Sequence, residues 1–437
     1  MTTTKLTPGL DGLDGLNHEI LAPRSWKLPV ILTVLTLAAG LGFCLTTAAS
    51  LRTKVSMMTG NWLGTVNFEL PSLASVVLLT ALMAGLTAVA WWAAAARLLH
   101  SGKVRLGTLI GAVYGVCWVL AFLIWVVAGK AGSLQFTSLL SGALFLSVPL
   151  IFGAMSGAVC EHVGVINVSI EGQLLAGAFL AAVVGSLTHN PWIGLVAAPV
   201  AGALVGTLLA LFAVRYWVDH IIVGVVLNTL VVGLTSYLFS TVLTQNTKVF
   251  SVAVKLPTWK IPLLGDIPVI GPVLFAQNAL VYIMYVAVIV LQIMLFRSRW
   301  GLRLRACGEH PRAADTVGIK VNRTRVVNTI LGGAIAGLGG AYFTVANGLA
   351  FGKEMSAGRG YIALAAMILG GWKPKGAVLA ALLFGFADNL QNSLSVVGVK
   401  VPSEFMLMAP YLVTIFAVAG LVGRVRPPAM EGKPYKG

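Results

Sequence analysis

Residues 139–160 read LLSGALFLSVPLIFGAMSGAVC and contain no charged side chain. A helix needs about 20 mostly apolar residues to cross the hydrocarbon core of a bilayer, so this run is long enough. Glycine, alanine and serine recur within it, and small residues let membrane helices approach each other closely. The stretch therefore predicts a membrane-spanning helix that packs among others.

Stretches of the same character occur along the whole chain. Together with 139–160 they predict spans at 28–50, 72–96, 106–128, 164–187, 191–214, 221–243, 277–296, 326–347, 360–372, 376–394 and 407–423. The stretch 360–372 is short for a full span, and we expect a half-helix that turns at Trp372–Lys375, where protein or a water-filled cavity surrounds it. The predicted fold class is an all-α membrane protein, a polytopic helical bundle with about 12 spans.

The composition supports this fold class. Of the 437 residues, 58% are hydrophobic and 10% are charged, whereas a soluble domain carries about 25% charged residues. A net charge of +16 in a soluble protein would suggest a nucleic-acid partner. Here all 30 Lys and Arg residues fall between the predicted spans. Membrane topology explains the charge, and we expect no nucleic-acid partner.

Lysine and arginine also orient the spans. Residues 1–27 are polar, and the run 28–50 is too long for a signal peptide, so it reads as the first span. With the N-terminus inside, the inside loops hold 21 of the 30 Lys and Arg residues, eight of them in 297–325. Because short cytoplasmic loops are enriched in positive residues, both termini are predicted to be cytoplasmic.

The four cysteines give no sign of a disulfide framework or a zinc site. Cys44, Cys117, Cys160 and Cys307 are widely separated, and no CxxC pair occurs. Cys160 stands next to Glu161 and His162, but adjacent side chains rarely converge on one ion. We therefore expect neither a metal nor another cofactor.

A small set of polar residues within or beside the spans is a candidate substrate pathway. Glu171 and Asp388 are the acidic residues inside predicted spans, where a charge costs roughly 2.5–3.5 kcal/mol and usually faces the bundle interior. The spacing of Asn167 and Glu171 predicts a shared helix face. Glu171 either caps a half-helix or pairs with a neighbouring backbone group, or it contacts substrate or a gate. The candidates are Asn167, Glu171, Gln173, Asn228, Asn347, Asp388, Asn389 and Asn392.

The loop 297–325 contains a predicted short helix. Pro311 suits the first turn of a helix, alanines follow, and Gly318 supplies a stop after Val317. A helix in a basic cytoplasmic loop is either a solvated segment or a docking element for a cytoplasmic partner.

Three segments resemble a known family. The run GEHPRAADTVGIKV at 308–321 resembles the coupling-helix segment of ATP-binding cassette importer permeases of the ribose, branched-chain amino acid and nucleoside group. Residues 164–182, GVINVSIEGQLLAGAFLAA, resemble that family's GVxNIGxEG signature. Residues 356–387 begin SAGRGYIALAA and continue through GWKPKGA, and they are similar to the nucleoside-type permeases.

The resemblance implies a permease subunit that moves nucleosides by alternating access. Its partners would be a cytoplasmic ATPase, a second related permease chain, an extracellular or lipid-anchored substrate-binding protein, and membrane lipid. Aromatic residues near the pathway would either stack on a base or pack as ordinary core. The residues implied in coupling to the ATPase are Gly308, Glu309, Pro311, Ala313, Ala314 and Gly318. Gly308→Arg or Glu309→Lys is expected to uncouple transport without unfolding the protein.

The resemblance also divides the chain. Residues 138–425 would form the permease core, with the coupling helix near 308–318, and 426–437 a cytoplasmic tail. Residues 1–137 would be an extension with three spans that compact nucleoside-type permeases lack.

Three alternatives differ in cargo, energy source or reaction. The same machine could import simple sugars or branched-chain amino acids. An ion-coupled secondary transporter could use Glu171 and Asp388 as ion sites. An intramembrane enzyme needs a convergent catalytic set, and no such motif appears in the spans. No GxxxxGK[ST] occurs in the chain, so we expect no enzyme activity here and a separate ATPase.

Overall fold

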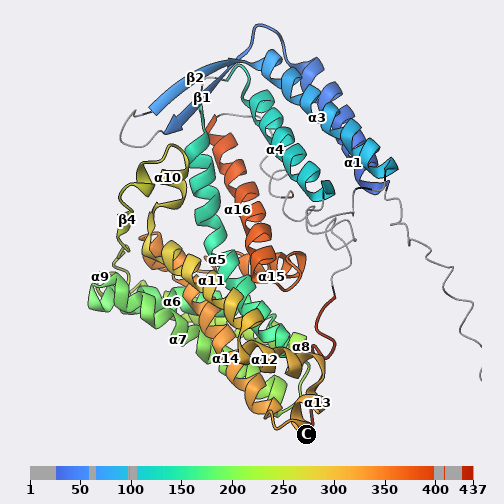
Figure 1. The fold of residues 1–437 in the computed structure, drawn as a ribbon. Helices are drawn as coiled ribbons and strands as arrows, with labels where there is room; N and C mark the ends of the chain where they lie inside the picture. Colours follow the sequence, from blue (N-terminus) through green and yellow to red (C-terminus); the bar gives the residue numbers. More distant parts are fainter. Residues whose placement is uncertain are drawn as a thin grey trace, which may run out of the picture. The chain divides into compact units, whose positions relative to one another are not determined.

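The computed structural model describes residues 26–58, 65–96, 98, 106–130, 132–397, 408 and 426–436. The chain forms two compact units, and both are mainly helical (Figure 1). The first contains the described parts of 26–55 and 67–134 with residue 397, and the second contains the described parts of 56–66, 135–396 and 400–437.

Three apolar helices make up the core of the first unit. They are α1 (Lys27–Ala39), which continues into the π-turn η1 (Gly40–Cys44), α3 (Ser72–Ala95) and α4 (Leu106–Val127). Thr36 lies at their centre, and its hydroxyl is 3.1 Å from the hydroxyl of Thr87 and 2.9 Å from that of Tyr114. The three hydroxyl groups also donate to backbone carbonyls, so none of them is buried without a partner.

Short strands are a correction to the all-α expectation. β1 (Arg52–Met58), β2 (Thr65–Pro71) and β3 (Leu134–Gln135) form a sheet in the order β2-β1-β3. Val66, Phe68 and Leu70 alternate with more polar residues, which is the period-two pattern of a strand. This pattern lies between two predicted spans, in a part of the chain that the prediction of helices alone does not cover.

The second unit is a bundle of longer helices. They are α5 (Phe136–His162), α6 (Ile170–Thr188), α7 (Pro191–Ala210) with η3 (Leu211–Arg215), α8 (His220–Leu238) with η4 (Phe239–Leu243), α11 (Ala279–Arg297), α14 (Val321–Gly340) with η6 (Tyr342–Ala346), α15 (Arg359–Leu369) and α16 (Pro374–Val397). Smaller elements connect them: α9 (Thr247–Phe250), β4 (Thr258–Lys260), η5 (Leu264–Asp266), α10 (Ile270–Leu274), β5 (Ala276–Asn278), α12 (Arg299–Glu309) and α13 (Pro311–Thr316).

Glycine lets three of these helices touch backbone to backbone. A Cβ on Gly202 of α7 would lie 2.1 Å from the carbonyl oxygen of Gly333 in α14. A Cβ on Gly177 of α6 would lie 2.1 Å from the carbonyl oxygen of Gly337. Because no side chain fits at these crossings, α6, α7 and α14 form a closely packed group.

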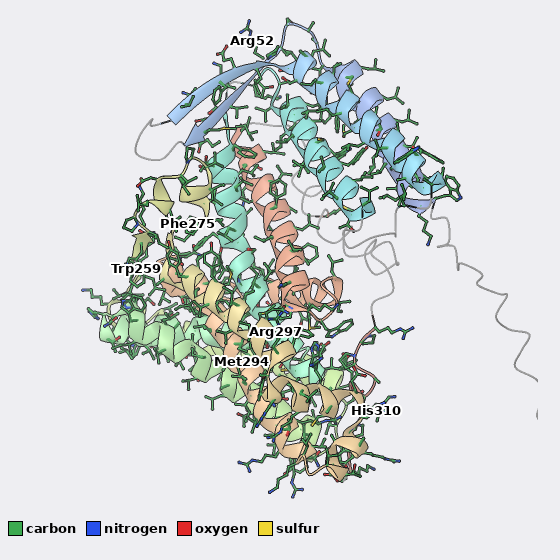
Figure 2. The ribbon with its side chains drawn as sticks, viewed as in Figure 1. Arg52, Trp259, Phe275, Met294, Arg297 and His310 are labelled. Carbon is green, nitrogen blue, oxygen red and sulfur yellow. The ribbon has the colours of Figure 1, made fainter. Side chains whose placement is uncertain are left out.

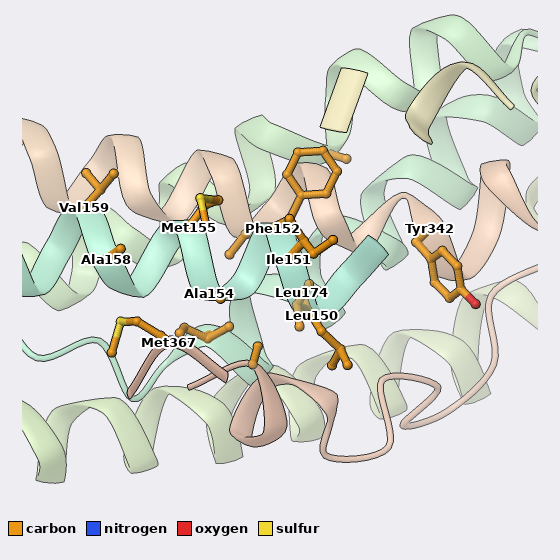
Figure 3. Packing of buried hydrophobic residues seen from close by; sticks show 14 of the residues in the cluster. Leu150, Ile151, Phe152, Ala154, Met155, Ala158, Val159, Leu174, Tyr342 and Met367 are labelled. Atoms are coloured by element: carbon orange, nitrogen blue, oxygen red, sulfur yellow. The ribbon is translucent and has the colours of Figure 1, made fainter. Parts of the chain in front are cut away.

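Apolar side chains fill the centre of this unit. Phe152 and Met155 of α5, Leu174 of α6 and Met367 of α15 are almost completely buried in one cluster (Figure 3). α16 lies alongside α5 (Figure 1), where a Cβ on Gly385 would be 2.5 Å from the carbonyl oxygen of Ala143. The short helix α15 is therefore held inside the bundle.

Nine helices among the described residues are long and apolar enough to cross a membrane. They are Lys27–Cys44, Ser72–Ala95, Leu106–Val127, Phe136–His162, Ile170–Thr188, Pro191–Arg215, His220–Leu243, Ala279–Arg297 and Val321–Ala346. Each overlaps a predicted span. The predicted half-helix is present as α15, α16 covers the predicted span 376–394, and the predicted span 407–423 falls almost wholly outside the described residues.

The helix ends correct several predicted boundaries. α14 begins at Val321, so Arg325, placed in a loop by the sequence, belongs to the helix and is 1% exposed. α5 extends to His162 and therefore includes Glu161, which is 2% exposed. The span predicted from 164 begins as a helix only at Ile170.

Candidate functional site

The segment between α11 and α14 forms two short helices. Arg297 ends α11 and His310 stands between α12 and α13 (Figure 2). Ser298 caps α12 by accepting the backbone N–H of Gly301 at 3.1 Å. Pro311 occupies the first turn of α13, where its missing N–H costs no helical hydrogen bond. The helix predicted from Pro311 is confirmed.

Gly318 ends this segment as predicted. Its φ of +81° is the left-handed conformation that glycine adopts most readily after a helix. On α13, Pro311 and Ala314 are buried and Ala313 is exposed. One side of α13 therefore packs against the bundle, and the opposite side is exposed.

An open groove lies beside α13. Leu302 of α12 is 63% exposed and Val317 is 74% exposed. They belong to a groove of about 610 Å³ lined by Leu302, Arg303, Ala306, Val317, Gly318, Ile319, Lys320, Arg323 and Thr324. Exposed apolar side chains with a polar, basic surround are typical of a surface that contacts another protein.

Gly308 and Glu309 differ in their surroundings. Gly308 is buried, and a Cβ on it would lie 2.2 Å from the carbonyl oxygen of His162. Any side chain there would push α12 away from the end of α5, so the expectation that Gly308→Arg leaves the fold intact is wrong. Glu309 is exposed, and its carboxylate accepts the backbone N–H of Ala429 at 3.4 Å.

Asn167 and Gln173 belong to a buried hydrogen-bond network. Asn167 Nδ2 donates to Ser156 Oγ and to Gln173 Oε1, both at 3.0 Å, and Asn167 Oδ1 accepts from Ser169 Oγ at 2.8 Å. All four side chains are 0% exposed. Asn167 precedes α6 and is not helical, so the predicted shared helix face with Glu171 is wrong. The network instead fastens the non-helical segment before α6 to α5.

Glu171 lies in the first turn of α6 and faces the start of α15. Its carboxylate accepts three hydrogen bonds, from the Ser356 hydroxyl at 2.6 Å and from the backbone N–H groups of Gly358 at 2.8 Å and Gly360 at 2.6 Å. A carboxylate at a helix N-terminus is stabilised by the unpaired N–H groups and by the helix dipole. A Cβ on Gly360 would lie 2.4 Å from the nitrogen of Glu171, so glycine permits this approach.

Asn228 joins three parts of the bundle. Its Oδ1 accepts the backbone N–H of Gly172 at 2.8 Å, and its Nδ2 donates to the carbonyl of Val168 at 2.9 Å and to the Tyr361 hydroxyl at 3.1 Å. α8 is thereby tied to the start of α6 and to α15. Tyr361 itself is 48% exposed, so its ring is available to a molecule beside α15.

Aromatic rings and a cation gather around η6. The ring centres of Phe145 and Tyr342 are 4.8 Å apart, and those of Tyr342 and Phe343 are 5.2 Å apart. The guanidinium of Arg359 lies 5.6 Å from the ring centre of Phe343. This distance is typical of a cation–π interaction.

Two predicted pathway residues join this group. The side chain of Asn347 interacts with the Tyr342 hydroxyl. Asp388 of α16 is half-buried and interacts electrostatically with Arg359. We call the following residues the η6 cluster: Phe145, Tyr342, Phe343, Asn347, Arg359 and Asp388. The cluster combines stacking surfaces, a cation, an anion and an amide in a small region.

The other polar residues predicted on α16 have different surroundings. Asn389 Nδ2 donates to the carbonyl of Leu139 at 2.7 Å and so links α16 to α5. Asn392 is exposed. Asp388 is therefore the member of this patch that the structure brings to the η6 cluster.

A contact between Glu161 and Trp372 is not predicted by the sequence. Trp372 Nε1 donates to Glu161 Oε2 at 2.5 Å, which joins the end of α5 to the turn after α15. The Cys160 thiol instead faces the carbonyl of Thr329, and His162 contacts the carbonyl of Ala158. Among the residues that the structure describes, no group of three His, Cys, Asp or Glu side chains converges as a metal site would require.

Comparison with known proteins identifies the family. Residues 139–418 match the family described as the permease component of branched-chain amino acid transport systems. The chain belongs to this permease family. It is a multi-pass membrane protein and the permease subunit of an ATP-binding cassette transporter, which confirms the resemblance found in the sequence.

Three relatives come from two bacteria. The guanosine ABC transporter permease protein NupQ of Bacillus subtilis is 37% identical over 67% of this chain and 94% of its own length. The nucleoside ABC transporter permease protein NupC of Lactococcus lactis is 38% identical over 68% of this chain and 96% of its own. A second guanosine permease protein of Bacillus subtilis, NupP, is 25% identical over 64% of this chain and 82% of its own. No solved structure matches the chain.

Proposed function

We propose that this permease imports nucleosides. The proposal rests on the identity of 37–38% to permeases named for guanosine and nucleosides, which match the chain over more than nine-tenths of their length. The η6 cluster supports it chemically. Aromatic rings stack on bases, and a few placed polar groups suit the hydroxyls and ring nitrogens of a nucleoside.

The proposed topology has about 12 spans with both termini in the cytoplasm. The apolar helices of the described residues supply most of these spans, and α15 serves as a half-helix. The segment with α12 and α13 then lies in the cytoplasm. Its eight Lys and Arg residues between 297 and 325 favour that side.

In this orientation α13 would dock on the ATPase. Ala313 lies on the exposed side of the helix, whereas Pro311 and Ala314 hold its other side against the bundle. Gly308 precedes the helix and packs closely against the end of α5, and Gly318 follows the last turn of the helix. Closure of the ATPases would push on α13 and move the attached helices α11 and α14, giving alternating access.

The partners would be those of a complete importer. A separate ATPase supplies energy, and an extracellular or lipid-anchored binding protein delivers the nucleoside. The exposed apolar side of α8, which includes Val225, Leu230 and Tyr237, suits lipid or a second permease. A heterodimeric pair is supported by the resemblance to two guanosine permeases of one bacterium, NupQ and NupP. This chain would provide the path and no enzyme activity.

The proposed division of the chain follows the family match. Residues 138–425 would be the permease core, and 426–437 a cytoplasmic tail. Residues 1–137 would be an extension outside that core. Within the core, Asn347 and Asp388 are the polar pathway candidates at the η6 cluster, and we assign them to substrate contact.

Uptake of radiolabelled guanosine and uridine tests the proposal in cells that carry or lack this chain. We expect uptake to require the chain, to survive collapse of the proton gradient and to stop when ATP is depleted. Ribose and leucine serve as controls for the other cargoes of this machine. Uptake of either alone would refute nucleoside import, and loss with the gradient at constant ATP would indicate an ion-coupled transporter.

A further inference from the structure

The C-terminal segment 426–436 lies across the end of the second unit that carries α13 (Figure 1). Two backbone hydrogen bonds fix its course, from Met430 N–H to the carbonyl of Gly308 at 2.9 Å and from Gly432 N–H to the carbonyl of Gly164 at 3.2 Å. The segment thus bridges α12 and the turn after α5. We call residues 426–436 the strap.

A buried arginine holds the far part of the strap. Arg325 Nη1 donates to the carbonyl of Lys433 at 2.8 Å, while the side chain is 1% exposed. Beyond this point the Tyr435 hydroxyl interacts with the carboxylate of Asp315 in α13. The ammonium of Lys436 lies 5.1 Å from the ring centre of Trp217. The strap therefore contacts α13 directly as well as α12 and α14.

A pair of carboxyl groups connects the strap to the bundle interior. The side chains of Glu431 and Glu161 interact directly with each other. Two neighbouring carboxyl groups repel each other unless at least one of them carries a proton. Trp372 Nε1 donates to the same Glu161 at 2.5 Å. Glu161 therefore contacts both Glu431 of the strap and Trp372 in the turn after α15.

α15 carries this connection to the proposed substrate region. It contains 11 residues and so spans about 16 Å at 1.5 Å per residue. Its first residue is Arg359 of the η6 cluster, and its N-terminus is fixed by Glu171. A shift of its Trp372 end is therefore transmitted along a rigid element to the cluster.

We propose that the strap couples α13 to α15, with Glu431 as a positioning residue. This inference rests on the proposed function, because it assumes that α13 receives the ATPase. Movement of α12 and α13 displaces the strap through Gly308 and Asp315. The strap then moves Glu161, Trp372 and α15 through the carboxyl pair. ATP hydrolysis and opening of the pathway are linked by this route in addition to the helices that flank α13.

The test compares Glu431→Ala, Glu431→Gln and Lys433→Ala in the importer reconstituted in liposomes with its ATPase and permease partners. The readout is the number of tritiated guanosine molecules imported per ATP hydrolysed. We expect Glu431→Ala to hydrolyse ATP but import roughly 5–100-fold less guanosine per ATP, since the buried Glu161 loses its partner in the strap. Glu431→Gln retains a donor for Glu161 and is expected to keep most of the coupling.

Controls separate coupling from stability and from the proposed function. Lys433→Ala changes an exposed strap side chain and leaves the carbonyl that Arg325 binds, so it is expected to behave as wild type. Trp372→Phe keeps an aromatic ring but removes the N–H donor to Glu161, and its coupling is expected to fall as in Glu431→Ala. Wild-type coupling in Glu431→Ala would overturn the inference. Wild-type importer that hydrolyses ATP without importing guanosine would instead refute the proposed function.

Discussion

The carboxylate of Glu171 in α6 accepts the backbone N–H of Gly360 in α15 at 2.6 Å. Two further hydrogen bonds, from the Ser356 hydroxyl and the Gly358 N–H, occupy its other oxygen. A carboxylate among apolar helices is costly unless hydrogen bonds and opposite partial charge compensate it. The N-terminus of the half-helix α15 supplies both, which explains how this acid is accommodated.

Removing this carboxylate is expected to destabilise the permease. Glu171→Ala leaves the N–H groups of Gly358 and Gly360 without their acceptor, and we expect the free energy of unfolding to fall by about 2–4 kcal/mol. Thermal unfolding in detergent, followed by intrinsic fluorescence, measures this change. Glu171→Gln is expected to be intermediate, since its amide turns a donor toward one of these N–H groups. An unchanged Tm together with a raised KM for guanosine would show that Glu171 serves substrate contact and not the cap.

The glycine contacts between α7 and α14 predict a second stability difference. Gly202→Ala would place a Cβ 2.1 Å from the carbonyl oxygen of Gly333, and overpacking of this kind costs about 1–3 kcal/mol. Gly233 of α8 is the matched control, because a Cβ there meets nothing within 4 Å. We expect Gly202→Ala to lower the Tm and Gly233→Ala to leave it equal or slightly higher. Equal Tm values for Gly202→Ala and wild type would contradict the packing.

The positions of the helices could be predicted because the bilayer imposes a simple pattern. An apolar run of about 20 residues has few alternatives to a span. The helix α13 could be predicted equally well, because Pro311 and Gly318 mark its two ends by local backbone chemistry. The non-helical start of the span predicted from 164 could not be predicted in this way. Asn167 is held there by partners in α5 and α6 that the local sequence does not identify.

The contacts at the strap could not be predicted either, because they join residues that are far apart in the sequence. Glu161 and Glu431 are 270 positions apart in the chain, and no periodicity relates them. Positive residues usually stay outside spans, so the sequence places Arg325 in a loop. In the structure it is buried at the start of α14 and binds a backbone carbonyl of the strap. The half-helix α15 was predicted from its length, whereas its link to Glu161 required the folded structure.

The exposed side of α13 predicts a variant that uncouples the importer without unfolding it. Ala313→Arg places a large charged side chain where the ATPase is proposed to dock, and the fold has room for it because Ala313 is exposed. We expect at least a tenfold loss of ATP-driven guanosine uptake, with an unchanged Tm. His189→Arg changes an exposed residue after α6 and serves as the control. Normal uptake with Ala313→Arg would count against docking on this helix.

The carboxyl pair predicts that docking of the strap depends on pH. Burial raises the pKa of the Glu431 carboxyl above its ordinary value. Glu161 is the acid that faces it from α5, and Glu309 of α12 contacts the strap backbone at Ala429. Because the docked form binds a proton more tightly than the free strap, docking is strongest below the ordinary glutamate pKa of about 4.3. It weakens as the pH rises through the raised pKa of docked Glu431.

A spin label on the strap measures this pH dependence. The label is attached at Lys433→Cys in a variant whose half-buried Cys44 and Cys117 are replaced by serine. We expect its mobility to increase with pH in the chain that keeps Glu431, because burial disfavours the deprotonated, charged form of the Glu431 carboxyl. In Glu431→Gln the mobility is expected to stay low across the same range, since glutamine donates to Glu161 without titrating. Identical pH profiles for the two variants would show that the carboxyl pair does not control the strap.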